Sequence, residues 1–213
     1  MAAAEDPKQP ERFLPFSFRL LAFTFFTMND NVSSNNTTPG SDGLGLIFLI
    51  GFMGCGKTTL GRKLASRLGY MFMDLDHILE AQEGITIAEH FAKYGEEAFR
   101  KLESEVLKTT KYPHHAIIST GGGLPCFFDN MDWMNAHGKT VYIKLSPKTL
   151  ADRLENEKEE RPLLKEHHGE ALVTFIANKL KEREGFYNKA NVVTDGLSLT
   201  AEKVEGLLKI KAI

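Results

Sequence analysis

The chain has few of the residues that mark secreted or metal-binding proteins. It has two cysteines among 213 residues, too few for a disulfide framework, and a reducing compartment suits them. Its cysteines and histidines do not have the spacing of zinc ligands. The formal net charge is −2, which favours neither a nucleic acid nor an anionic membrane as partner. These scarcities predict a cytoplasmic protein without nucleic-acid or membrane partners.

Long hydrophobic runs are also lacking. The N-terminal apolar stretch 13–28 has 16 residues and is interrupted by Arg19, which makes it short for a membrane span. Acidic residues precede it, and no small-x-small cleavage site follows, so it matches secretory and transit signals poorly. Residues 29–45 are rich in Asn, Ser, Thr and Gly. We expect 1–45 to be a disordered or dispensable extension, with Met28 as a candidate translation start.

Beyond residue 45, short apolar runs alternate with helical patterns, as in an α/β domain. This alternation predicts right-handed crossovers and a doubly wound parallel sheet, with ligands at the carboxyl ends of the strands. We expect one domain, 46–213, with insertions near 76–105 and 155–169. The expected strands are 46–50, 70–73, 116–119, 140–145 and 191–194, and the expected helices are 59–68, 96–110, 127–136, 147–157, 169–187 and 200–210.

The segment after the first expected strand fits the phosphate-loop pattern Gly-x4-Gly-Lys-[Ser/Thr]. It reads GFMGCGKT over 51–58 and leads into an expected helix, a context that favours a real loop over a chance glycine-rich turn. Glycines let the backbone amides curl inward, and the helix start adds positive potential. Lys57 can then reach the β- and γ-phosphates, and the Thr58 hydroxyl can bind Mg²⁺. The sequence therefore predicts a nucleoside-triphosphate site.

Two aspartates, Asp74 and Asp76, end the second expected strand. One carboxylate could hold Mg²⁺, directly or through water, while the other accepts a proton from an attacking hydroxyl. The same residues could equally form a solvated turn that caps the next helix. Spacing alone does not decide between these two interpretations.

Arg100 and Glu103 are three positions apart on an expected helix and so share a face. Glu103 could hold the guanidinium for a bidentate carboxylate contact. Taken alone, however, the spacing favours an exposed ion pair worth about 0.2–0.5 kcal/mol.

Three glycines, Gly121, Gly122 and Gly123, follow the third expected strand. A plain tight turn needs one or two, so three favour close approach of a ligand to bare backbone. The strand itself lacks a terminal aspartate, which leaves Asp74 as the candidate carboxylate for the metal.

Two further arginines are candidates. Arg161 follows a charged run, which is usually just a solvated face, yet an arginine on such a segment could swing in to neutralise a transferred phosphoryl group. Arg183 lies near the end of a long expected helix. It could anchor a substrate, although a favourable interaction with the helix dipole is the slightly preferred explanation from the residues alone.

Together these segments resemble the shikimate kinase family over about 46–210. The resemblance implies a three-layer α/β/α phosphate-loop kinase fold with a five-stranded parallel sheet, a helical substrate-binding insertion and a lid. It implies transfer of the ATP γ-phosphate to the 3-hydroxyl of shikimate, on the route to chorismate and aromatic amino acids. The matching segments are GFMGCGKTTLGRKLA (51–65), DLD (74–76), FRKLE (99–103), STGGG (119–123), RPLL (161–164) and REGFY (183–187).

The resemblance also implies a role for each matching residue. Asp76 would contact the shikimate hydroxyls and act as the base, Arg100 and Arg183 would grip the carboxylate, and Asp74 would support Mg²⁺ through water beside Thr58. Phe91 and Phe99 would be apolar walls of the shikimate site. ATP would contact Gly54, Cys55, Gly56, Lys57, Thr58, Thr59 and the lid arginine Arg161, and Gly121, Gly122 and Gly123 would line the substrate.

The sequence departs from the family pattern near the lid. Many members carry an extra arginine shortly before the lid arginine, near the adenine. Here the nearest is Arg153, eight positions before Arg161, with an acidic run between them. Residues 1–45 match nothing in the pattern.

Two alternatives remain at this stage. One is another small-molecule kinase of the same fold, such as a gluconate or nucleotide kinase; Asp76 with Arg100 and Arg183 suits a carboxylate-bearing polyol better. The other is a nucleotide-binding regulatory module without catalysis, although none of the candidate catalytic residues is missing. We expect a monomer.

Overall fold

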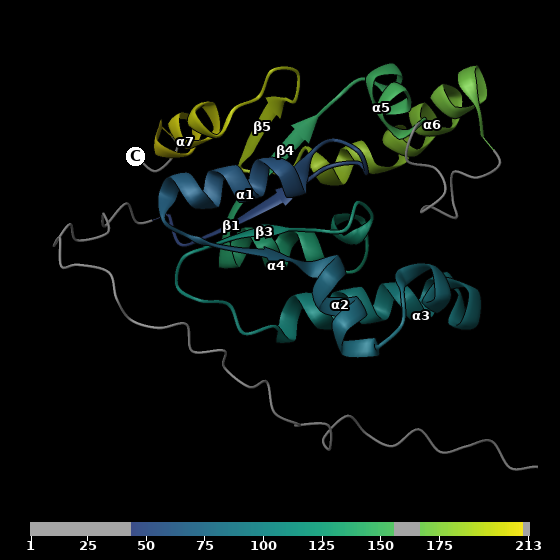
Figure 1. Cartoon of the computed structure of the whole chain (residues 1–213), viewed down its shortest axis with the longest axis horizontal. Helices are drawn as coiled ribbons and strands as arrows, with labels where there is room; N and C mark the ends of the chain where they lie inside the picture. The colour runs from purple at the N-terminus through teal and green to yellow at the C-terminus, as the bar shows by residue number, and fades with distance from the viewer. Residues whose placement is uncertain (1–43, 156–166, 211–213) are drawn as a thin grey trace, which may run out of the picture. The chain divides into compact units, whose positions relative to one another are not determined.

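The computed structural model describes residues 44–155 and 167–210, and its centre is a five-stranded parallel sheet (Figure 1). The strand order is β2-β3-β1-β4-β5, and every pairing is parallel. The fold class predicted from the sequence is confirmed, and every expected strand is present. Strands 46–50 and 116–119 have the predicted bounds, and the ends of the other three differ by one or two residues. The strands are β1 (Leu46–Ile50), β2 (Met71–Asp74), β3 (Ala116–Ser119), β4 (Gly138–Lys144) and β5 (Val192–Asp195).

Helices connect and cover these strands. Each expected helix is present, although several ends differ. The helix expected over 147–157 ends at Leu154, and positions 156 and 157 lie outside the residues that the structure describes. The helices are α1 (Lys57–Leu68), α2 (Leu75–Glu83), α3 (Ile87–Thr109), α4 (Asn130–His137), α5 (Pro147–Leu154), α6 (Gly169–Tyr187) and α7 (Ala201–Ile210), with a 3₁₀ turn η1 (Leu124–Cys126).

The largest differences from the sequence prediction lie between 75 and 95. Helix α2 was not predicted, and α3 begins at Ile87 instead of residue 96. A capping box starts α3. The Thr86 hydroxyl accepts a hydrogen bond from the Glu89 backbone amide, and the Glu89 carboxylate accepts one from the Thr86 backbone amide. Gly95 (φ 79°) kinks α3, which breaks the apolar periodicity that would have predicted a single helix.

The core has two halves, one on each face of the sheet. Alternate residues of β1 point to opposite faces, so Ile47 and Leu49 join one half while Phe48 and Ile50 join the other. The first half includes buried side chains of α1, α5, α6 and α7, and the second includes side chains of α2, α3 and α4. Helices on both faces give the three layers seen in Figure 1.

The strand register brings the predicted motifs to one edge of the sheet. Asp74 at the end of β2 pairs with Ser119 at the end of β3, and Ser119 pairs in turn with Leu49 of β1. The phosphate loop follows β1, and the glycine turn follows β3. The three segments therefore meet at the carboxyl ends of adjacent strands, as expected for a doubly wound sheet.

Some sequence predictions fall outside the described ranges. These are the nature of residues 1–43, most of the lid segment 155–169, and Arg161. Within the described ranges, no helix is both long and apolar enough to cross a bilayer.

Candidate active site

The phosphate loop curls between β1 and α1 as its glycines require. Gly56 has φ 97° and caps α1, a left-handed conformation that side chains rarely adopt. A side chain on Gly51 (φ 142°) would approach the Ile143 carbonyl oxygen to 2.8 Å. Lys57 is buried, and its Nζ donates to the carbonyl oxygens of Gly51 (2.9 Å) and Phe52 (3.1 Å). The loop therefore holds an ammonium group inside its curl.

Thr58, Asp74 and Ser119 place three oxygen-bearing side chains together. The Thr58 hydroxyl donates to Asp74 Oδ2 at 2.9 Å and lies 3.4 Å from the Ser119 hydroxyl. Asp74 also accepts from the Asp76 backbone amide and so caps α2. The capping interpretation is therefore confirmed for Asp74, while its other carboxylate oxygen faces Thr58 and its role at a metal stays a prediction.

The second aspartate, Asp76, lies in the first turn of α2 beside the glycine turn. A methyl group on Gly121 would lie 2.9 Å from Asp76 Oδ1 and 2.5 Å from Glu103 Oε1. Two carboxylates from different helices therefore approach the same glycine, and only a residue without a side chain fits between them.

The ion pair of Arg100 and Glu103 is buried, and the exposed pair favoured from spacing alone was wrong. The two residues are 5% and 4% exposed, and Arg100 Nη1 donates to Glu103 Oε2 at 2.5 Å. Glu96 accepts from the other side of the guanidinium, at 3.0 Å from Nη2. The spacing within the helix could not predict this burial, because the glycine turn that packs against the two side chains is distant in the sequence.

Aromatic rings surround the same guanidinium. The Arg100 Cζ atom lies 4.6 Å from the ring centroid of Phe127, 5.3 Å from that of Phe99 and 5.5 Å from that of Phe91. A methyl group on Gly123 would lie 2.6 Å from Arg100 Nη1. Carboxylates and rings together fix the arginine in one orientation.

Burial changes the acidity of Glu103. Desolvation raises the pKa of the Glu103 carboxyl to about 7, with a smaller contribution from Asp76, against the opposing attraction of Arg100 and Arg183. The pKa of Arg100 is raised despite its own desolvation, because Glu103 and Glu96 favour its charged form. Asp76, Glu103, Arg100 and Arg183 thus form one interacting cluster.

Arg183 comes from α6 and reaches the phosphate-loop side of this cluster. Its Cζ atom lies 5.5 Å from the ring centroid of Phe52. Its Nη1 atom is buried and has no hydrogen-bond partner among the described residues. The helix-dipole explanation that was slightly preferred from sequence does not account for a buried, unsatisfied donor, whereas an anionic ligand does.

Arg153, the departure from the expected pattern, lies against the phosphate loop. Its Nη1 donates to the carbonyl oxygens of Gly54 and Cys55, each at 3.3 Å. It is the last-turn basic residue of α5. Arg153 therefore lies beside the phosphate loop.

Sequence reasoning missed three residues of this region. Ser119 and Tyr187 lie inside the matching segments STGGG and REGFY but received no role of their own, whereas Phe127 lies outside every such segment. The Tyr187 hydroxyl donates to the Gly122 carbonyl oxygen at 2.5 Å. Cys126 lies nearby, and desolvation raises the pKa of its thiol to about 11, so it stays neutral.

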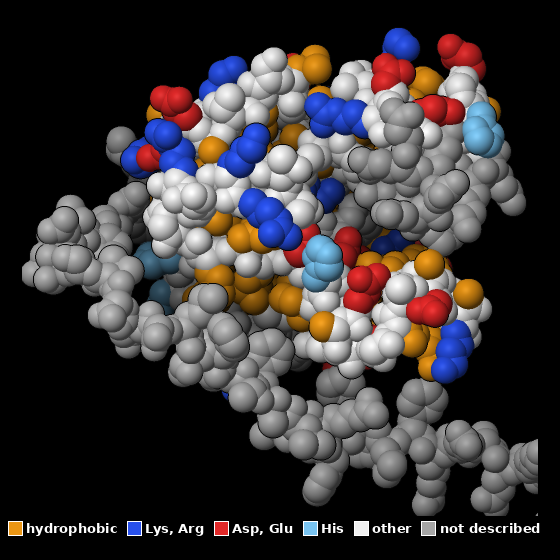
Figure 2. Space-filling model, in the orientation of Figure 1, with side chains coloured by type: hydrophobic (Ala, Val, Ile, Leu, Met, Phe, Trp, Pro, Cys, Tyr) orange, Lys and Arg blue, Asp and Glu red, His pale blue; other side chains and the backbone are white. Residues whose placement is uncertain are grey.

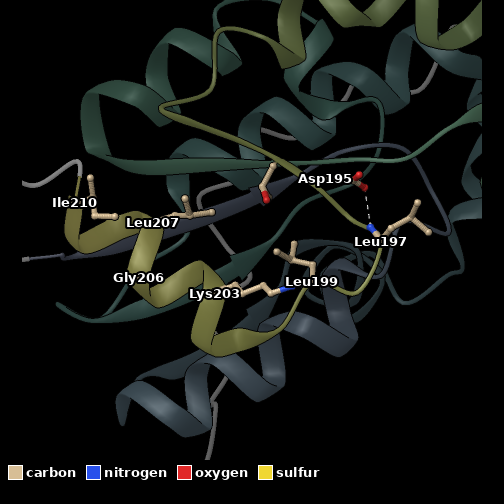
Figure 3. A pocket seen from close by; sticks show the side chains of 8 residues that line it. Asp195, Leu197, Leu199, Lys203, Gly206, Leu207 and Ile210 are labelled. Atoms are coloured by element: carbon tan, nitrogen blue, oxygen red, sulfur yellow. Dashed lines mark hydrogen bonds between the residues drawn. The ribbon is translucent and has the colours of Figure 1, made fainter.

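Charged side chains of both signs gather in a hollow on the face shown in Figure 2, between α1 and the pair α2 and α3. A second hollow, of about 420 Å³, lies between the end of β5 and α7 (Figure 3). Its lining includes Leu197, Leu199 and Leu207, and Lys203 there donates to the Ser198 carbonyl oxygen. It contains none of the predicted site residues, so we place the candidate active site at the first hollow.

A parallel sheet in the order 2-3-1-4-5, a phosphate loop after its central strand and a buried arginine–carboxylate cluster beside that loop define a phosphate-loop kinase. The family model described as shikimate kinase matches residues 53–209. The chain belongs to the shikimate kinase family.

Individual relatives agree with this assignment. A shikimate kinase of Parabacteroides distasonis is 47% identical over 156 residues, which cover 73% of this chain and 90% of the relative. The crystal structure of shikimate kinase from Bacteroides thetaiotaomicron is similar with a TM-score of 0.72 at 38% identity, covering 79% of this chain and 99% of that one. The Acinetobacter baumannii enzyme in complex with shikimate is similar with a TM-score of 0.71 at 32% identity, covering 79% and 93%.

Proposed function

We propose that this protein transfers the γ-phosphate of ATP to the 3-hydroxyl of shikimate, giving shikimate 3-phosphate and ADP. The observation that carries the proposal is the meeting of Asp76, Arg100, Glu103 and Arg183 beside the phosphate loop. Shikimate is a small anion with one carboxylate and three hydroxyls. Two guanidinium groups suit its carboxylate, and an aspartate suits its hydroxyls.

The donor side consists of the phosphate loop and α1. Backbone amides of Gly54, Cys55 and Gly56 and the start of the helix would cradle the phosphates, with Thr59 in the first turn. Lys57 would exchange its contacts with the Gly51 and Phe52 carbonyls for β- and γ-phosphate oxygens.

The residues also fit a magnesium ion. Mg²⁺ prefers oxygen ligands and keeps several waters, so one hydroxyl and one carboxylate with substrate phosphates are enough to hold it. Thr58 and Asp74 offer this pair at 2.9 Å, with Asp74 acting through water. Within 44–155 and 167–210 no three acidic, histidine or cysteine residues cluster as a self-sufficient metal site, which agrees with a site completed by substrate. When bound, the ion would neutralise charge between the β- and γ-phosphates.

On the acceptor side, Asp76 would accept the proton of the attacking hydroxyl. The base need not be strong, because charge on the nucleophile develops late in a loose transition state. Arg100 and Arg183 would bind the carboxylate and so direct the hydroxyl toward the phosphate. Gly121, Gly122 and Gly123 would leave room for the ring, with Phe91 and Phe99 as apolar walls.

The remaining assignments stay predictions. They are Arg161 as a lid arginine that stabilises the transferred phosphoryl group, residues 1–45 as an extension before the 46–213 domain, the insertions near 76–105 and 155–169, and a monomer in the cytoplasm. Exclusion of water by a closing lid would limit wasteful hydrolysis of ATP.

An ADP-release assay over a panel of acceptors tests the proposal. Shikimate with Mg²⁺ should support turnover, and gluconate and nucleoside monophosphates should not. Without Mg²⁺, the rate with shikimate should fall to background. Turnover with gluconate or a nucleotide in place of shikimate would overturn the assigned substrate, and ATP binding without turnover on any acceptor would indicate a regulatory module.

A further inference from the structure

Tyr187, the last residue of α6, lies between two parts of the proposed acceptor site, the glycine turn and Arg183. The residue is fully buried, and its Oη donates to the Gly122 carbonyl oxygen at 2.5 Å. Arg183 lies four positions earlier on the same face of the helix and interacts electrostatically with the phenol. Burial raises the pKa of the phenol, so the hydroxyl keeps its proton and remains a donor.

The Arg183 guanidinium has a donor that no protein group in the described residues satisfies. The Arg183 guanidinium carbon lies 5.5 Å from the ring centroid of Phe52, and the phenol of Tyr187 interacts electrostatically with the same group. What remains is the buried Nη1, without a hydrogen-bond partner among the described residues. An unsatisfied buried donor is rare in folded proteins and is expected where a ligand supplies the acceptor.

The backbone at Gly122 packs against the phosphate loop. A methyl group on Gly122 would lie 3.1 Å from the Met53 backbone nitrogen and 3.5 Å from the Gly51 carbonyl oxygen. The glycine turn and the phosphate loop are therefore in backbone contact. Any shift of Gly122 changes the position of the acceptor relative to the phosphates.

Core filling alone does not explain the hydroxyl of Tyr187. The ring packs against Tyr142 in a tilted arrangement at a centroid distance of 4.9 Å, and a phenylalanine ring would fill the same space. A buried hydroxyl is unfavourable unless it is hydrogen-bonded, and the hydroxyl of Tyr187 is satisfied by the Gly122 carbonyl oxygen.

We propose that Tyr187 is a positioning residue, whose hydroxyl holds Arg183 and the Gly122 turn in register and so sets where the acceptor carboxylate lies relative to the phosphate loop. The inference rests on the proposed function, because it takes Arg183 as the carboxylate anchor. Tyr187 acts through Arg183 and does not itself touch the reacting atoms.

The first test compares Tyr187→Phe with the matched control Tyr142→Phe, which removes a hydroxyl from the neighbouring ring, also buried. Tyr187→Phe should raise the KM for shikimate roughly 3- to 10-fold, the effect of one lost hydrogen bond, and leave the KM for ATP unchanged. Tyr142→Phe should change neither constant. Thermal unfolding of both variants separates loss of stability from loss of positioning.

The second test is a double-mutant cycle with Arg183→Ala. If Tyr187 acts through Arg183, Tyr187→Phe should have no further effect on the shikimate KM, or on shikimate affinity measured by calorimetry, in the Arg183→Ala background. Equal effects of the two phenylalanine variants, a parallel rise in both KM values, or additivity in the cycle would each overturn the inference. A wild-type protein that neither binds nor phosphorylates shikimate would overturn the proposed function itself.

Discussion

At the scale of single residues, the proposed chemistry depends on charged groups held by neighbouring polar atoms. Lys57 is the clearest case on the donor side, since two loop carbonyls hold its ammonium group. On the proposed acceptor side, Arg100 is buried and held by two carboxylates, and the half-buried Asp76 lies beside the glycine turn. The predictions for these residues concern rates and affinities more than folding.

Replacement of Lys57 by alanine removes the charged donor inside the phosphate loop. We expect Lys57→Ala to lower kcat by at least roughly 10²–10³-fold, as for loss of one preorganised donor to developing charge. Steady-state kinetics with saturating shikimate measure this. Lys63→Ala, an exposed lysine on the same helix, is the control and should keep wild-type activity. Near-normal turnover of Lys57→Ala would contradict the phosphate-loop assignment.

Asp76→Asn keeps the size of the side chain and removes its basicity. The rate should fall by roughly 10²–10⁴-fold, the usual contribution of a general base, with ATP binding nearly unchanged. Kinetics together with nucleotide titration distinguish the two effects. The control Asp132→Asn, at an exposed aspartate of α4, should change neither the rate nor ATP binding. A change confined to ATP affinity would show that Asp76 is not the base.

At the scale of elements, the acceptor site depends on how α2 and α3 begin. Asp74 caps α2 and Thr86 caps α3, so both helix starts are determined locally by side chains. The kink at Gly95 then separates Phe91 in the first part of α3 from Arg100 and Glu103 in the second. The two parts meet again where the Phe91 ring approaches the guanidinium.

Loss of the α3 cap should therefore affect both stability and acceptor binding. Thr86→Ala should lower the free energy of unfolding by about 0.5–2 kcal/mol and raise the KM for shikimate more than that for ATP. Thr200→Ala is the matched control, since Thr200 accepts from the Lys203 amide at the start of α7, which holds no site residue. It should destabilise to a similar extent without changing either KM. Identical kinetic effects of the two variants would contradict the role given to α3.

At the scale of the whole molecule, the buried cluster makes stability depend on pH. Desolvation raises the pKa of Glu103 from 4.5 to about 7. The folded chain then holds this proton more tightly than the unfolded chain. The contribution to stability is therefore fully present below pH 4.5 and is lost as the pH rises towards 7.

Glu103→Gln should remove this pH dependence. Between pH 4.5 and 7, the free energy of unfolding of the wild type should fall on the order of 1–3 kcal/mol further than that of the variant. Denaturant titrations at several pH values measure the difference. Glu105→Gln, at an exposed position of α3, should behave as the wild type. Parallel curves for wild type and Glu103→Gln would show that Arg100, Asp76 and Arg183 leave this carboxyl with an ordinary pKa.

The amino-acid sequence by itself determined the alternation of strands and helices, the phosphate loop and the family, because each depends on local spacing. Tertiary structure decided the burial of Arg100 with Glu103, the position of Arg183 and the bond from Tyr187 to Gly122. Those contacts join α3, the turn after β3 and α6, which are far apart along the chain. Their energies depend on exclusion of water by packing, which no local pattern of residues records.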